Sequence, residues 1–264
     1  VLLKLGGALL TDKDGREALR PTVLQRLADE VAAWPGAGRG QLLLSHGSGS
    51  FAHVAVAESG FLEHPDDPLA LAKVAAAAAR LDRFVVAALI ERDLPALPVP
   101  GSLLARCEDG QVAELRAELV SGLLESGLLP VVFGDAAPDT VRGGSIASTE
   151  PLLAGLARAL RPARIVLATD VDGDFDRDPH AGGARRYTQI TVSEREAVLH
   201  RLAGARAAAT DFTGGMASKV AWMFDLVEAL PELEVRILSG LRPGAVAAAL
   251  AGDPKAGGTL ITAG

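Results

Sequence analysis

The chain has 264 residues, 49% of them hydrophobic, and a formal net charge of −7. This length fits one large α/β domain or two closely joined lobes. No run of about 18 apolar residues is present, so we expect a soluble protein without a membrane span. The negative charge disfavours nonspecific nucleic-acid binding, which needs clustered cations. A single cysteine, Cys107, excludes an internal disulfide framework and indicates a reducing, cytoplasmic compartment.

Apolar runs alternate with helical patterns along the chain, which is typical of a mainly parallel sheet covered by helices on both faces. We therefore predict an α/β fold, a three-layer αβα sandwich. Strands are expected at Leu2–Leu5, Gln41–Ser45, Leu128–Phe133, Arg164–Thr169, Glu234–Leu238 and Thr259–Thr262. Helices are expected at Thr22–Ala33, Pro68–Arg92, Glu114–Ser126, Glu150–Leu160, Ser193–Leu202, Gly215–Ala229 and Pro243–Ala251. Arg106–Ala113 and Asp139–Gly144 are predicted to form hairpins.

A soft lobe boundary is predicted near Arg161 and Pro162, directly after one of these helices. It divides an N-terminal lobe, residues 1–160, from a C-terminal lobe, residues 161–264. No low-complexity linker separates them, so we expect one compact unit.

Lysine is rare, with five among 26 basic residues, and three of the five lie beside glycine- or threonine-rich segments. These three are Lys4, Lys13 and Lys219. A compact ammonium beside glycine N–H groups suits a phosphate better than a planar guanidinium does. Chance placement among 29 glycines is the alternative. Lys73 and Lys255 are interpreted as ordinary surface charges.

The segment Gly47–Ala52 formally matches the dinucleotide-binding fingerprint, and Asp66 and Asp67 follow about twenty residues later. Those acids lie in a proline-broken stretch and do not end a second strand, so the context fails. The chain also lacks a Walker A sequence. We interpret the segment as a glycine loop leading into a helix N-terminus, a general anion site.

Six segments share short motifs in chain order. They are Lys4–Ala8 with Thr11–Lys13, His46–His53, Phe133–Asp135, Thr169–Gly173 with Arg177–Pro179, Thr213–Lys219 and Gly257–Thr259. Together they resemble the amino acid kinase superfamily and, within it, the isopentenyl phosphate kinases. The histidine that ends the second segment is the most specific feature, because relatives that phosphorylate carboxylates or carbamate generally lack it. The chain departs from the motifs at Ala52, usually glycine, and at Ser148–Glu150, usually S-G-D.

The resemblance implies that the C-terminal lobe binds ATP, which brings Mg²⁺ with it, and that no dedicated metal site is needed. Lys4 and Lys219 would hold the β- and γ-phosphates, Gly6 and Gly7 would donate backbone N–H groups, and Lys13 would stabilise the transferring group. The implied nucleotide-binding residues are Lys4, Gly6, Gly7, Ala8, Ser48, Thr169, Asp170, Val171, Asp172, Gly173, Asp178, Gly214, Gly215 and Lys219.

The resemblance places the acceptor phosphate in the N-terminal lobe, with His53 as its hydrogen-bond donor. The implied acceptor-binding residues are Gly47, Ser48, Gly49, Ala52, His53, Val74, Ala78, Ser145, Ile146 and Thr149. Val74 and Ala78 share one face of the helix Pro68–Arg92 and line the hydrocarbon end of the substrate in this interpretation. The alternative is that small residues on this face only permit close helix packing.

Two site residues also have ordinary structural interpretations. His53 could bond a backbone carbonyl at the start of its helix. Glu150 is expected to orient the lysines, but an acid in a first helical turn often only balances the helix dipole. With Glu150, the predicted catalytic set is Lys4, Lys13, His53, Glu150 and Lys219. His46 is expected to be structural, and His64, His180 and His200 to lie on the surface.

The resemblance thus predicts an ATP-dependent kinase that converts isopentenyl phosphate, or a similar alkyl monophosphate, to the diphosphate. Family members commonly form homodimers, so a homodimer is expected. Two alternatives remain open at this stage. One is a kinase for another small phosphate or phosphonate, including a fosfomycin-type kinase, and the other is a nucleotide-binding protein without turnover.

Overall fold

The computed structural model describes residues 1–12, 15–177, 183–204 and 215–264, with the backbone alone at 203–204 and 215–219. Its centre is an eight-stranded sheet in the order β10-β12-β11-β9-β1-β2-β6-β3. These strands are β1 (Leu2–Leu5), β2 (Leu43–His46), β3 (Ala96–Pro100), β6 (Leu129–Phe133), β9 (Arg164–Thr169), β10 (Gln189–Thr191), β11 (Glu234–Ser239) and β12 (Thr259–Thr262). Neighbouring strands pair in parallel except β11 and β12.

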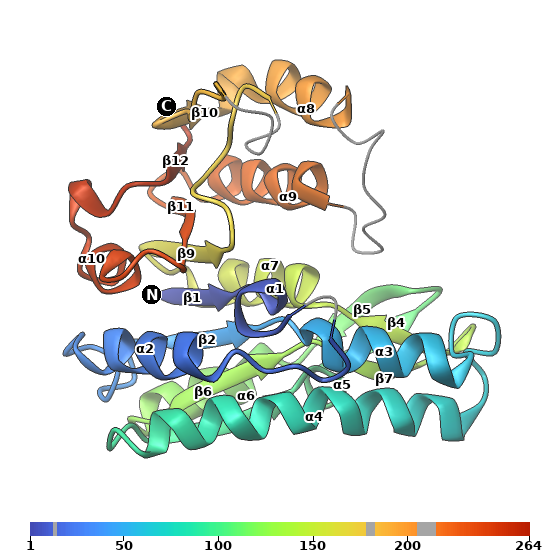
Figure 1. Ribbon diagram of the computed structural model, residues 1–264. Helices are drawn as coiled ribbons and strands as arrows, with labels where there is room; N and C mark the ends of the chain where they lie inside the picture. Colours follow the sequence, from blue (N-terminus) through green and yellow to red (C-terminus); the bar gives the residue numbers. More distant parts are fainter. Residues whose placement is uncertain (13–14, 178–182, 205–214) are drawn as a thin grey trace.

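Helices cover both faces of this sheet (Figure 1). One face carries α1 (Gly7–Leu10), α2 (Pro21–Ala32), α4 (Pro68–Ile90) and α10 (Ala245–Ala251), and the other carries α6 (Ala117–Glu125), α7 (Thr149–Leu160), α8 (Arg195–Gly204) and α9 (Gly215–Ala229). Successive strand residues face opposite sides, so Leu2 packs in one apolar core and Leu3 in the other. The predicted three-layer fold with a mainly parallel sheet is confirmed.

A second, four-stranded sheet in the order β5-β4-β7-β8 lies beside the first. Its strands are β4 (Ala105–Glu108), β5 (Gln111–Leu115), β7 (Asp135–Asp139) and β8 (Gly143–Ala147). Both predicted hairpins are present in it, each with longer strands than expected. The remaining helices are α3 (Gly49–Ser59) and α5 (Gly101–Leu104), with short 3₁₀ turns at Val192–Glu194 and Pro254–Ala256.

Asp139 joins the turns of these two hairpins. Its carboxylate accepts hydrogen bonds from the backbone N–H groups of Asp109 and Gly110 in one turn, and of Val141 and Arg142 in the other. Burial alone raises the pKa of the Asp139 carboxyl, but these four hydrogen bonds outweigh it and hold the pKa well below its usual range. One carboxylate therefore fixes how the two hairpins sit together.

Several elements differ from the prediction. The short helices α1 and α5 were not expected. The strands β3 and β10 were not expected, and both lie at the edges of the large sheet. Pro98 and Pro100 hide β3 in the sequence, but an edge strand tolerates proline because one side of it needs no N–H donors. The helix expected from Glu114 begins only at Ala117, because Glu114 and Leu115 pair with β4 as the end of β5.

The predicted lobe boundary falls where α7 ends, with Arg161 in the left-handed conformation (φ 46°). The large sheet continues across this point, because β1 of the first lobe pairs with β9 of the second. The division of roles between the lobes stays a prediction.

Candidate active site

The predicted site loops follow the C-terminal ends of four adjacent strands, β9, β1, β2 and β6. Because these strands are parallel, the loops after them meet at one edge of the sheet, which is where open α/β sheets bind ligands.

Lys4 forms a buried ion pair at this edge. It lies on β1 with 8% of its surface exposed, and its Nζ donates to Oε1 of Glu150 in the first turn of α7. The other carboxylate oxygen, Oε2, accepts from Oγ1 of Thr149 at 3.1 Å. Burying an ammonium is costly unless a carboxylate pairs with it. The contact therefore fits the expectation that Glu150 orients Lys4, rather than a surface acid that only balances a helix dipole.

The two glycine loops cross in backbone contact. A Cβ on Gly7 would lie 2.5 Å from the backbone nitrogen of Gly49, and Gly49 itself has φ +49°. Either site therefore excludes a larger residue. Thr11 joins the two loops, because its Oγ1 donates to the carbonyl of Gly7 at 2.9 Å and accepts from the N–H of Ser50 at 3.0 Å. The sequence marked Thr11 as part of a motif, but only the fold gives it this bridging role.

One expected phosphate donor is wrong. The N–H of Gly6 donates to the carbonyl of Ala168 at 2.8 Å, because the pairing of β1 with β9 extends one residue past the strand. The N–H of Gly7 lies in the first turn of α1, where helical N–H groups have no partner within the helix. Gly7 therefore remains the predicted backbone donor of this loop, and Ala8 follows it in the same turn.

His53 lies one turn into α3, on an exposed surface, past the second glycine loop. Ser48 ties that loop to the end of β6, since its Oγ donates to the carbonyl of Gly134 at 2.7 Å. Ala52, the neighbour of His53, packs against a small apolar cluster that is separate from the two main cores. The buried members of this cluster are Phe61, Ala70, Val74 and Ala136. His53 thus follows a residue that packs on an apolar cluster to which α3, α4 and β7 contribute.

The other residues expected to bind the acceptor are divided between two faces. Ser145 pairs with Ala137, which lies in a main core, whereas Ile146 pairs with Ala136 in the small apolar cluster. Neighbouring strand residues point to opposite faces, so Ser145 and Ile146 cannot both present side chains to one pocket. Ile146, which is 39% exposed, remains a predicted acceptor-binding residue, and Ser145 is removed from that set.

The alanine-rich face of α4 is packed. Ala78 is fully buried, as are Ala77 and Leu81, and α4 runs directly against α3. This favours the interpretation that the small residues permit close helix packing, so the assignment of Ala78 to a substrate pocket is corrected. Val74 is also buried, but it lies in the small apolar cluster beside Ala52, so its contact with a hydrocarbon group stays a prediction.

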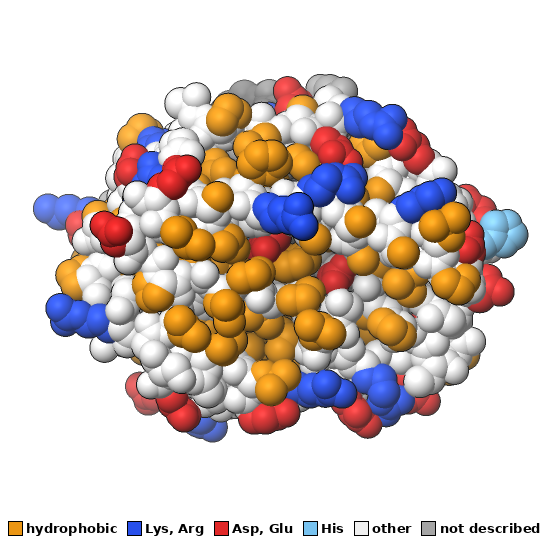
Figure 2. All heavy atoms as spheres, turned by 90° about the horizontal axis from the view of Figure 1, so that it is seen from below, with side chains coloured by type: hydrophobic (Ala, Val, Ile, Leu, Met, Phe, Trp, Pro, Cys, Tyr) orange, Lys and Arg blue, Asp and Glu red, His pale blue; other side chains and the backbone are white. Residues whose placement is uncertain are grey.

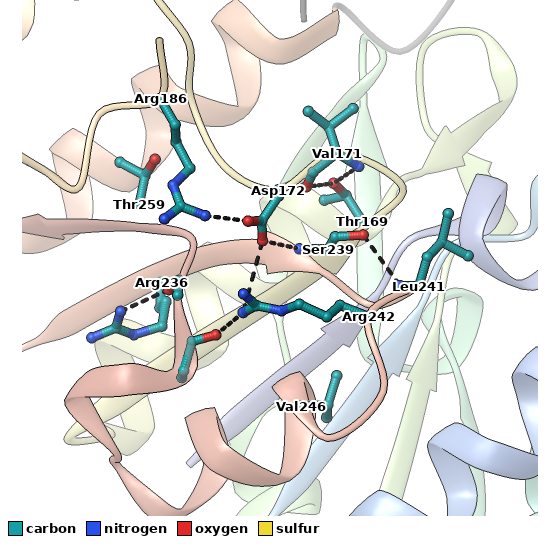
Figure 3. A network of polar contacts seen from close by, with 12 residues as sticks. Thr169, Val171, Asp172, Arg186, Arg236, Ser239, Leu241, Arg242, Val246 and Thr259 are labelled. Carbon is teal, nitrogen blue, oxygen red and sulfur yellow. Dashed lines mark hydrogen bonds and ion pairs between the residues drawn. The ribbon is translucent and has the colours of Figure 1, made fainter.

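On the other side of β1, the loop after β9 is organised by Asp172. Its carboxylate accepts from Arg186 and from the N–H of Ser239 at 3.1 Å, and Nη2 of Arg242 lies 3.9 Å away (Figure 3). Thr169 closes the turn through hydrogen bonds of its Oγ1 with the backbone of Val171. Asp172 therefore has a structural role as well as its predicted nucleotide-binding role.

Arg186 and Arg242 supply positive charge at this loop, and neither was predicted, because no motif of the sequence contains them. Gly173 has φ +112°, and a Cβ there would lie 2.4 Å from Oγ1 of Thr259, so the turn needs glycine. Asp170 is exposed beside this turn.

Four predicted residues, Lys13, Asp178, His180 and Gly214, lie outside the described residues. Gly215 begins α9, and the side chain of Lys219 on that helix also lies outside them. Across the described part of the chain, no group of three or more His, Cys, Asp or Glu side chains could hold a metal ion. None of its helices is long and apolar enough to cross a bilayer.

His46 is fully buried, and its structural role stays a prediction. His64 and His200 are exposed, as predicted. Asp135, in the motif after β6, is buried and accepts from Oγ of Ser102. Burial raises the pKa of the Asp135 carboxyl.

Crossed glycine loops and a buried lysine at the end of a parallel sheet define an α/β protein built to bind phosphate groups. The amino acid kinase family matches residues 1–239, and the chain belongs to this family.

Among its relatives, the isopentenyl phosphate kinase of Methanothermobacter thermautotrophicus is 32% identical over 99% of this chain and 98% of that protein. The isopentenyl phosphate kinase of Haloferax volcanii is 34% identical over 83% of this chain and 85% of that protein. An X-ray structure of an isopentenyl phosphate kinase superimposes with a TM-score of 0.79 and 28% identity, covering 99% of both chains. The resemblance seen in the motifs is thereby confirmed.

Proposed function

We propose that this protein is an ATP-dependent kinase that phosphorylates isopentenyl phosphate, or a similar alkyl monophosphate, to the diphosphate. The likeness to isopentenyl phosphate kinases over nearly the whole chain supports the substrate class. The observation that carries the chemistry is the buried pair of Lys4 and Glu150 beside the crossed glycine loops.

In the reaction an oxygen of the acceptor monophosphate attacks the γ-phosphorus of ATP, and the bond from that phosphorus to the β-phosphate oxygen breaks. Several negative charges meet, so positioning and charge neutralisation supply most of the catalysis. Lys4 neutralises phosphate charge, Glu150 holds the ammonium in place, and Gly7 lets the first loop approach closely. Mg²⁺ enters with the nucleotide and neutralises phosphate charge further.

The acceptor phosphate binds at His53 in this proposal, and its hydrocarbon group packs on the small apolar cluster around Val74. A histidine that donates a hydrogen bond suits an acceptor that is a phosphomonoester dianion. A carboxylate acceptor has less need of such a donor. Lys13 and Lys219 complete the lysine set that the family resemblance implies.

Turnover with a panel of acceptors tests this function. The purified protein, ATP and Mg²⁺ are incubated with isopentenyl phosphate, dimethylallyl phosphate, fosfomycin, UMP, glutamate or no acceptor, and ADP and new diphosphate signals are followed by ³¹P NMR. We expect diphosphate from the alkyl monophosphates, and loss of turnover when EDTA removes divalent cations. Preference for fosfomycin or UMP would assign a different acceptor, and ATP binding without turnover on any acceptor would indicate a protein that only binds nucleotide.

We also propose that the protein forms a homodimer through the face that carries the edge strand β3. Figure 2 shows hydrophobic side chains gathered on this face. Exposed apolar residues of the elements around β3 are Phe84 and Ile90 on α4, Leu97 on β3, Leu103 on α5 and Leu119 on α6. A contiguous apolar patch favours a protein partner, and the same patch on a second copy is its simplest complement. The prolines of β3 blunt strand pairing, so side chains would make the contact.

Light scattering after size-exclusion chromatography is expected to give twice the 27.1 kDa mass of the chain. Leu97→Arg is expected to shift the mass toward the monomer. Leu241→Arg is the matched control, because Leu241 is 41% exposed against 39% for Leu97 but follows β11, far from β3 in the sheet. A monomeric parent protein would contradict the proposal.

A cytoplasmic location is a further part of this proposal. It rests on the single cysteine, Cys107, which is buried and has no second cysteine in the chain to form a disulfide with. Cell fractionation with an antibody to the protein would test it.

A further inference from the structure

A buried histidine–carboxylate pair lies directly behind the second glycine loop. His46 is the last residue of β2, and Asp82 lies on α4; both are buried. Nε2 of His46 is 3.1 Å from Oδ1 of Asp82, and Nδ1 is 3.2 Å from the carbonyl oxygen of Gly47. The imidazole stacks on Phe133 with ring centroids 5.7 Å apart.

Both ring nitrogens of His46 therefore face acceptors. A neutral imidazole has a single N–H and can donate to only one of them. Both contacts are hydrogen bonds when the pair holds one further proton, either on the ring beside a carboxylate or on Asp82 as a neutral acid. In both forms Nδ1 carries a hydrogen that donates to Gly47.

The carbonyl of Gly47 is one of four fixed points of the second glycine loop, together with the N–H of Gly47, which donates to the carbonyl of Leu5 at 3.0 Å. The others are the hydroxyl of Ser48, which donates to Gly134, and the N–H of Ser50, which donates to Thr11. Gly47 also faces the first loop, because a Cβ on it would lie 3.0 Å from the nitrogen of Gly7. A change in the orientation of Gly47 would therefore move both loops at the place where they cross.

We infer that Asp82, acting through His46, is a positioning residue for the acceptor phosphate. The contact of Asp82 with Nε2 holds the imidazole with Nδ1 against the carbonyl of Gly47, which fixes Gly47 and with it the loop that leads into α3 and His53. Asp82 also lies two turns along α4 from Val74 of the small apolar cluster, so one helix sets both the phosphate loop and the hydrocarbon surface. This inference rests on the proposed function, because it assumes that this loop binds the acceptor.

Two substitutions separate positioning from simple packing. Asp82→Leu has a similar size but cannot bond Nε2, so the imidazole loses the contact that holds its orientation and Gly47 loses a fixed partner. Asp82→Asn can donate its amide N–H to Nε2, which keeps the ring proton on Nδ1 and the bond to Gly47 intact. Val85→Ala is the matched control, because it removes core volume from the same helix, one turn on, without touching the pair.

The experiment measures KM for isopentenyl phosphate, KM for ATP, kcat and Tm for these variants. For Asp82→Leu we expect a KM for isopentenyl phosphate raised about tenfold, with KM for ATP changed less than about twofold. Asp82→Asn is expected to stay within about twofold of the parent protein in both constants. Val85→Ala is expected to lower Tm and leave both KM values unchanged.

Three results would overturn the inference. They are an unchanged KM for isopentenyl phosphate in folded Asp82→Leu, equal increases in both KM values, and Asp82→Asn as impaired as Asp82→Leu.

If Asp82→Leu does not fold, ¹⁵N NMR of histidine-labelled parent protein decides, because Nδ1 of His46 must be protonated. If the parent turns over another acceptor but not isopentenyl phosphate, the proposed function fails, and titration calorimetry of that acceptor with the variants still tests the positioning role.

Discussion

Replacing Lys4 with methionine is expected to lower kcat by about a hundredfold or more, which corresponds to about 2.7 kcal/mol of lost transition-state stabilisation. Methionine keeps the length of the side chain but removes the charge that meets the phosphates. The loss should appear in kcat more than in KM for ATP, because charge neutralisation matters most when phosphoryl groups meet. Steady-state kinetics with ATP and isopentenyl phosphate measures it.

Two exposed residues provide the controls, Lys73 for the substitution at Lys4 and Glu118 for a substitution at Glu150. Lys73→Met removes a lysine from the surface of α4 and should leave kcat unchanged. Glu150→Gln should lower kcat at least tenfold, because it uncouples the buried ion pair. Glu118→Gln changes an exposed first-turn acid of α6, so it reports the helix-dipole effect alone and should leave kcat unchanged. Equal, small effects of the two glutamate substitutions would show that Glu150 only balances the helix dipole. Near-normal turnover of Lys4→Met would refute the catalytic role of Lys4.

The second large effect is expected at His53. His53→Ala should lower kcat/KM for isopentenyl phosphate about a hundredfold, since it removes a charge-assisted hydrogen bond to the acceptor phosphate. Affinity for ATP should stay nearly intact, because the predicted nucleotide loops lie after β9 and β1. His53→Gln keeps a donor and should retain part of the rate.

The matched control is His64→Ala, because His64 is also exposed but lies beyond the end of α3. Titration calorimetry of isopentenyl phosphate provides a second measurement that needs no turnover. An unchanged affinity of His53→Ala for this substrate would contradict the assignment and leave a role in helix-start hydrogen bonding.

The sequence predicted the central elements well and the edges poorly. The strands β1, β9 and β12 and the helix α9 have the expected bounds. Strands that are buried on both faces appear in the sequence as unbroken apolar runs, so the sequence alone predicts them. The edge strand β10 has only three residues, and β3 contains prolines, which an edge strand tolerates because it is only half paired.

The candidate site was predicted to a similar extent. The motifs located Lys4, Glu150 and the two glycine loops, which the structure brings together. They could not separate Ser145 from Ile146, because the face of a strand residue depends on the register of its neighbour. They also missed Thr11 as the bridge between loops and Asp82 as the partner of His46.

Long-range side-chain partners were decided only by the tertiary structure. The carboxylate of Glu30 on α2 accepts hydrogen bonds from the N–H groups of Gly244, Val246 and Ala247, and so caps α10 from more than 200 residues away. No residue near Gly244 in the chain indicates this cap, and the N-cap residue of α10 has no side-chain hydrogen bond of its own.

Apolar periodicity, glycine positions and rare lysines are local properties, so the sequence by itself determined the layers, the loops and the kind of chemistry. The partner of a buried charge is not local. Lys4 meets Glu150 across 146 positions because β1 lies at the centre of the sheet and α7 packs on the face toward which Lys4 points. Strand order and helix packing decide such pairs, because an ion must be neutralised by whatever group the fold places within a few ångströms of it.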